Sequence, residues 1–141
     1  MDRQQIFQDF VNNSHGQGRA MKSKVHEGMQ CTYFGCHGCA IGGQPGFKEK
    51  FADRMKDSED ITYWLTEDYA DDQLRLDLLE FFGIVGDSQD DIAWLQSLQD
   101  FHDAENIFDF SKGAWLQLHL NPRAVERFCT DNDLKIPTFP T

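Results

Sequence analysis

The sequence predicts a mainly α-helical fold: a compact bundle of about five or six helices with one short β-hairpin near residues 31–41. Three observations support this prediction. Apolar residues recur at a helical period in several stretches, and residues that start or stop helices flank these stretches. Twelve Phe, three Trp and three Tyr supply large side chains that can close a core. The alternative is an α+β fold in which Leu116–Leu120 forms another strand.

The length of 141 residues indicates a single domain over residues 1–141, with an extended tail at 136–141. The first predicted helix spans Arg3 to Val11, because its four large apolar residues fall on one helical face. These residues are Ile6, Phe7, Phe10 and Val11. Turn-forming residues at 12–18 are expected to end it.

The stretch from Cys31 to Gly43 holds three of the four cysteines and has no helical period. Residues Thr32–Phe34 favour a strand, and Cys39–Ile41 can pair with them across Gly35–Gly38. We therefore expect a tight hairpin here. A two-stranded hairpin is marginal alone, so this one must pack on the helices.

Further helices are predicted over Phe47–Lys56, Asp72–Phe82 and Ser88–His102, with a short aromatic segment at Ile61–Leu65. Gly83 is a fitting C-terminal cap, and Ser88 can cap the N-terminus of the helix that follows. Residues 104–109 are expected to be loop or a fraying end. Asn121 followed by Pro122 signals the start of a last helix that ends near Asn132.

The formal net charge of -11 disfavours direct binding to nucleic acid and to anionic membranes. No apolar run approaches 18 residues, so no membrane span is expected. The N-terminal residues lack the pattern of a secretory signal. The sequence therefore favours a cytoplasmic protein whose cysteines are reduced thiols, metal ligands or redox groups.

The candidate metal site consists of Cys31, Cys36 and Cys39 with a histidine as fourth ligand, because zinc prefers four nitrogen or sulfur ligands. His102 is the chosen candidate, and His26 and His37 are alternatives. The second ligand pair of strong zinc signatures is absent. Small packed thiols in a glycine-rich turn are therefore favoured, with no cofactor. A redox pair is less favoured, since no helix continues after Cys39.

No complete catalytic constellation is present. The sequence has neither a phosphate-binding glycine loop nor a serine nucleophile motif. The acidic residues at 67–72 lack the spacing of a calcium loop and suit the start of a helix. His102 is more simply a hydrogen-bonded histidine at a helix C-terminus than an acid or base. Enzymatic activity is not expected.

Short motifs of the chain resemble those of uncharacterised small proteins of bacteria, phages and mobile elements. The motifs are Ile6-Phe7, Cys31-Thr32-Tyr33, Cys39-Ala40-Ile41-Gly42 and Leu98-Gln99-Asp100-Phe101-His102-Asp103. Cys36-His37 and Gly43 depart from that pattern. The resemblance brings no activity, but it implies that the Cys31/Cys39 hairpin and the His102 helix share one core.

The function favoured by the sequence is a non-enzymatic protein-interaction or accessory protein of a mobile element, acting on a protein partner or by self-association. A small zinc protein built on the cysteine cluster is the first alternative. An acidic, DNA-mimicking inhibitor is the second, because the net charge is strongly negative.

Overall fold

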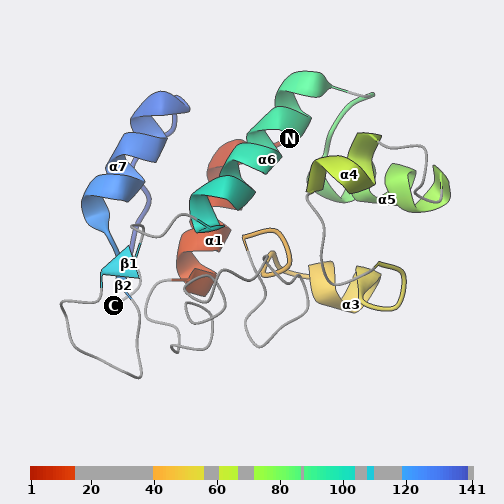
Figure 1. The fold of residues 1–141 in the computed structure, drawn as a ribbon, viewed down its shortest axis with the longest axis horizontal. Coiled ribbons are helices and arrows are strands. Elements are labelled where there is room, and N and C mark those ends of the chain that lie inside the picture. The colour runs from red at the N-terminus through yellow and green to blue at the C-terminus, as the bar shows by residue number, and fades with distance from the viewer. Residues whose placement is uncertain are drawn as a thin grey trace.

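The structure is a computed structural model, which describes residues 1–14, 40–55, 61–66, 72–86, 88–103, 108–109 and 119–139. Its helices are α1 (Arg3–Ser14), α3 (Phe47–Phe51), α4 (Ile61–Thr66), α5 (Asp72–Phe82), α6 (Gln89–Asp103) and α7 (Pro122–Asp131). The short strands β1 (Phe108–Asp109) and β2 (His119–Leu120) pair antiparallel. The prediction of a mainly helical fold is confirmed. Figure 1 shows α1 and α6 between α7 on one side and α3, α4 and α5 on the other.

The centre of the molecule is an aromatic contact between α1, α6 and α7. Phe7 of α1 stacks on Phe128 of α7 with ring centroids 5.0 Å apart, and Phe101 of α6 lies 4.7 Å from the same ring. All four apolar residues predicted for the inner face of α1 are buried. Replacing a fully buried Phe by Ala typically costs about 3–5 kcal/mol. These rings therefore fix the relative positions of three helices.

A second aromatic group joins α3 to α5. Phe47 and Phe51 are fully buried, and the ring of Phe81 meets each of them edge-on at 5.6 Å. Gly46, with a φ of 83°, starts α3 in a left-handed conformation that favours glycine. Both aromatic groups belong to one continuous cluster of buried apolar residues.

Two glutamines of α6 hold the start of α4. Oε1 of Gln99 accepts a hydrogen bond from the backbone N–H of Ile61 at 2.8 Å. Oε1 of Gln96 accepts from both the backbone N–H and the hydroxyl of Thr62. The first N–H groups of a helix have no partner within the helix. The packing of α4 on α6 therefore depends on α6 supplying these acceptors.

The predicted helix signals at Gly83 and Asn121 are confirmed. Gly83 has a φ of 72° and follows the last turn of α5, where the N–H of Ile84 reaches the carbonyl of Leu79 at 2.9 Å. The side chain of Asn121 accepts from the N–H of Arg123, with Pro122 at the first helical position. Ser88 also caps, although its contact to the N–H of Asp91 is long at 3.4 Å.

The hairpin predicted near 31–41 is wrong at Ala40 and Ile41, which lie in turns, while residues 31–39 lie outside the described part of the chain. The physical reason is Gln44. Its backbone N–H bonds the carbonyl of Ile41 at 3.1 Å, and its Nε2 donates to the carbonyl of Ala40 at 3.1 Å. These bonds occupy carbonyl groups that a strand ladder would use.

Several predicted boundaries also differ. Helix α1 continues to Ser14 rather than ending at Val11, and α3 ends at Phe51 instead of reaching Lys56. The loop expected at 104–109 contains β1. The proposed strand at Leu116–Leu120 is present at His119 and Leu120, and its other residues are not described. Short strands of this kind depend on a partner that is distant in sequence.

In the described part of the chain, no helix is both long enough and apolar enough to cross a membrane.

Candidate functional site

The predicted metal site is described at His102 alone. Cys31, Cys36 and Cys39 lie outside the described residues, as do the alternative ligands His26 and His37. Within the described ranges, no three His, Cys, Asp or Glu side chains are grouped so that they could hold a metal ion. Zinc binding by the cysteine cluster therefore stays a prediction.

His102 lies in the last turn of α6 and is 2% exposed. Its ring meets Phe10 of α1 edge-on, with centroids 6.1 Å apart. On the same helix, the carbonyl of Ile6 accepts a hydrogen bond from Nε2 of Gln44, which also binds Ala40. Helix α1 is thus contacted both by His102 and by the segment that follows Cys39.

A pair of glutamines on α1, Gln4 and Gln8, lies one helical turn apart and bonds residues near the other end of the chain. Nε2 of Gln4 donates to the carbonyl of Lys135 at 3.0 Å, and the N–H of Lys135 donates to Oε1 of Gln4 at 2.8 Å. Gln8 exchanges the same two bonds with Thr138, at 2.7 Å and 2.9 Å. We call Gln4 and Gln8 the glutamine face, and residues 134–139 the extended segment.

Each glutamine bonds the backbone N–H and C=O of one residue of the extended segment rather than that residue's side chain. An amide side chain carries one acceptor oxygen and one NH₂ donor, which match the backbone C=O and N–H of one residue. Because Gln4 pairs with residue 135 and Gln8 with residue 138, the segment runs in the same direction as α1. Figure 1 shows it returning beside α7. Lys135, Ile136 and Thr138 are exposed.

Apolar side chains anchor the extended segment at positions before, between and after these contacts. Pro137 is buried, and Leu134 and Phe139 are partly buried against the core. Proline has no backbone N–H, so its burial leaves no unpaired donor. The segment therefore combines apolar anchors with backbone recognition, as extended peptides do when they bind to proteins.

A turn at Asn132 and Asp133 aims the segment at α1. The N–H of Leu134 donates to the carbonyl of Cys129 at 2.8 Å, and Asp133 has a φ of 56°. This is the Schellman arrangement, in which glycine normally occupies the left-handed position. Among the described residues, Asp133 is the one non-glycine residue with positive φ. The turn is therefore held in a conformation that costs free energy.

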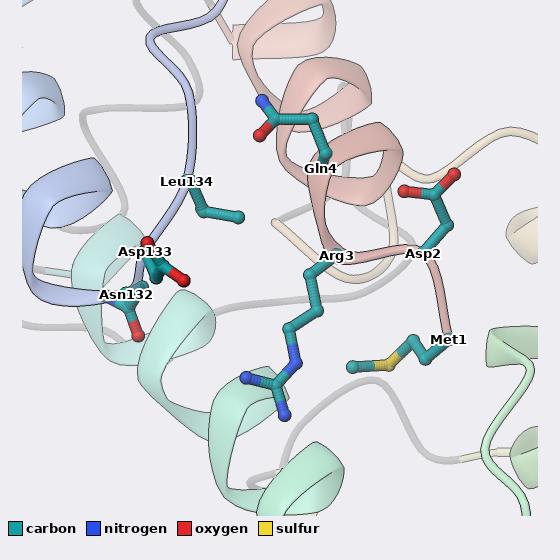
Figure 2. Close-up of a pocket in the computed structure, with 7 residues that line it drawn as sticks. All are labelled: Met1, Asp2, Arg3, Gln4, Asn132, Asp133 and Leu134. Carbon is teal, nitrogen blue, oxygen red and sulfur yellow. The ribbon is translucent and has the colours of Figure 1, made fainter.

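An open hollow of about 740 Å³ lies between this turn and the start of α1. Figure 2 shows Gln4 and Leu134 at one side of the hollow and Arg3 pointing toward α6. Arg3 forms an ion pair with Asp91 at 2.8 Å, and its guanidinium carbon lies 5.7 Å from the Trp94 ring centre. Arg3 is the one cationic side chain among the residues that line the hollow, and it is already paired.

The sequence reasoning missed the glutamine face. Gln4 and Gln8 lie beside the apolar stripe of α1 and look like ordinary solvated residues of an amphipathic helix. A signal was present in the extended tail, because a segment without helix or strand must find partners for its backbone groups. That signal does not say which side chains supply the partners.

The fold and the site define a small, mainly helical protein in which one helix holds an extended segment by its backbone. Comparisons of the chain with protein-family models, with curated proteins and with solved structures found no match.

Proposed function

We propose that this chain is a non-enzymatic protein-interaction protein that recognises an extended peptide segment on the glutamine face of α1. The proposal rests on the four hydrogen bonds between the two glutamine side chains and the backbone of residues 135 and 138. In the structure this face holds the chain's own extended segment. A partner's segment of the same chemistry would make the same contacts.

The contacts also define which peptides the face accepts. The apolar anchors correspond to Leu134, Pro137 and Phe139, three positions whose side chains pack on the core. The residues between them are exposed and free to vary. The partner is therefore an extended segment with an apolar residue, two variable residues, a proline, one variable residue and an aromatic residue.

Surface composition is consistent with binding through a small, specific face rather than through a broad apolar one. Among the described residues, the large apolar side chains that are most exposed are Leu76, Val85 and Ile136. They lie on three different segments: α5, the loop before α6 and the extended segment. Single exposed apolar residues of this kind are ordinary on soluble domains.

The test uses a full-length variant, called the emptied variant, in which the chain's own segment is loosened from the face by removing two of the three anchors, Pro137→Ser with Phe139→Ser. A fluorescent peptide with the sequence of residues 134–141 is then titrated into it and followed by anisotropy. We expect saturable binding with a Kd on the order of 100 μM, from four exposed hydrogen bonds and three apolar anchors. The same peptide methylated on the backbone nitrogens of residues 135 and 138 should not bind.

The controls distinguish backbone recognition from non-specific binding. Adding Gln4→Ala and Gln8→Ala to the emptied variant should abolish binding, whereas Gln5→Ala should leave it unchanged. Gln5 is exposed and bonds Asp9 within α1. Equal binding of the methylated peptide, or binding that survives loss of both glutamines, would contradict the proposal.

A further inference from the structure

The junction between α7 and the extended segment holds a non-glycine residue in the left-handed region. Asp133 adopts a φ of 56°, and its N–H reaches the carbonyl of Thr130 at a long 3.5 Å. A β-region conformation would suit an aspartate better than the left-handed region does. Opening this turn frees Asp133 from the left-handed region and releases the segment from its own α1. It breaks the bonds from the N–H groups of Asp133 and Leu134 to the carbonyls of Thr130 and Cys129.

The contacts that hold the segment do not depend on which chain supplies it. The two glutamines bond backbone atoms of residues 135 and 138, and the apolar anchors are buried or partly buried beside them. A segment from a second copy restores all of these contacts. Exchange of an identical element between protomers loses few contacts for this reason.

We propose that two copies of this chain form a dimer by exchanging residues 134–139, each segment binding the glutamine face of the other copy. The inference rests on the proposed function, because it uses the same face, and it names the partner as a second copy of this chain. The two exchanged contacts are equivalent, so the dimer has two-fold symmetry and is closed. Asp133 becomes extended in both copies.

Charge opposes this dimer and makes it sensitive to salt. Each copy has a formal net charge of -11, and the hinge residue Asp133 and the nearby Asp131 are both acidic. Repulsion between like-charged chains is screened as ionic strength rises. The dimer fraction of the wild-type chain is expected to grow with both protein concentration and sodium chloride.

The test changes the hinge and leaves the face intact. Proline has a φ near −65° and cannot adopt the conformation of Asp133. In Asp133→Pro the segment cannot turn back onto its own α1, but it can still reach a second copy. Multi-angle light scattering should give the mass of two chains, with at least tenfold tighter dimerisation than the wild type.

Two matched variants support the reading of that result. Asp133→Gly retains the left-handed turn, because glycine favours it, and should dimerise at least tenfold more weakly than Asp133→Pro. Combining Asp133→Pro with Gln4→Ala and Gln8→Ala should return the chain to a monomer. A monomeric Asp133→Pro whose residues 134–139 exchange their amide hydrogens freely would overturn the proposal.

A second measurement applies if Asp133→Pro does not fold. Isotope-labelled and unlabelled wild-type chains are mixed at high salt, incubated and examined by native mass spectrometry. Dimers containing one chain of each kind are expected, and their absence at any salt concentration overturns the exchange. Peptide binding to the emptied variant is independent of this outcome, so the proposed function can survive when the exchange fails.

Discussion

Gln8 and Thr138 exchange two hydrogen bonds, in which Nε2 donates to the threonine carbonyl at 2.7 Å and the threonine N–H donates to Oε1 at 2.9 Å. The two residues are 130 positions apart in the sequence. This pairing fixes the extended segment on the first helix of the chain.

Gln8→Ala is expected to lower the free energy of unfolding by about 1–2 kcal/mol, because two exposed hydrogen bonds to Thr138 and one to Asn12 are lost. Urea unfolding measures the change, and hydrogen exchange at the amide of Thr138 reports it locally. Gln5→Ala is the matched control, since the Gln5 side chain bonds Asp9 of the same helix, as Gln8 bonds Asn12, and its backbone bond to Asp2 is kept in the variant. An unchanged exchange rate at Thr138 would show that Gln8 does not hold the segment.

Gln99→Leu is expected to destabilise the protein by about 1–3 kcal/mol, because the N–H of Ile61 loses its acceptor in a buried place. Leu keeps most of the volume, so a cavity contributes little. Gln96→Leu should cost less, since Gln96 and Thr62 are only partly buried and water can replace the side chain. Equal effects of the two variants would contradict burial as the cause.

The pKa of the Asp77 carboxyl is lowered from its ordinary value near 3.8. The larger cause is the Arg54 guanidinium, which bonds Asp77 at 2.7 Å, and the second is a hydrogen bond from the Gln73 amide. A lowered pKa in the folded state means that the unfolded chain binds more protons at acidic pH. The stabilisation is therefore present above the ordinary pKa and is lost as the pH falls through the folded value.

Asp77→Asn should accordingly flatten the fall of the urea midpoint below about pH 4. Arg54→Ala should reduce the same fall of the urea midpoint at acidic pH. The double variant should show little further reduction beyond either single variant. Because the pair is exposed, the effect is small and should shrink in high salt. An identical dependence of the urea midpoint on acidic pH in the wild type and in Asp77→Asn would contradict this assignment.

Burial raises the pKa of the Cys129 thiol, which is 1% exposed in the inner face of α7. A neutral, covered thiol is a poor nucleophile. We expect iodoacetamide to modify Cys129 in the folded chain far more slowly than in urea, as measured by peptide mass spectrometry. The folded state should also lose stability as the pH rises above the thiol's ordinary pKa, because the unfolded chain releases the thiol proton first. Equal modification rates in the folded and unfolded chain would contradict the burial.

Zinc analysis of protein purified without a histidine tag tests the cysteine cluster. The sequence favours packed thiols over a metal site, so we expect clearly less than one zinc per chain. Cys39→Ser should leave that content unchanged. One zinc per chain that is lost in Cys39→Ser would instead establish the alternative built on Cys31, Cys36, Cys39 and His102.

The sequence by itself determined the helical class and most of the helix faces. The apolar stripe of α1 and the inner face of α7 are local patterns, since residues three or four apart share a helical face whatever surrounds them. The helix ends at Gly83 and Asn121 could be predicted for the same reason. A cap is satisfied by backbone groups of its own helix within a few residues.

The tertiary structure decided how unpaired backbone groups find partners. Gln44 turns the chain at Ala40 where the sequence favoured a strand, and Gln4 and Gln8 bind an extended segment from the other end of the chain. A glutamine on a helix surface has the same local pattern whether it meets water or a distant peptide group. Contacts between residues so far apart are set by the packing of whole helices, which no local pattern contains.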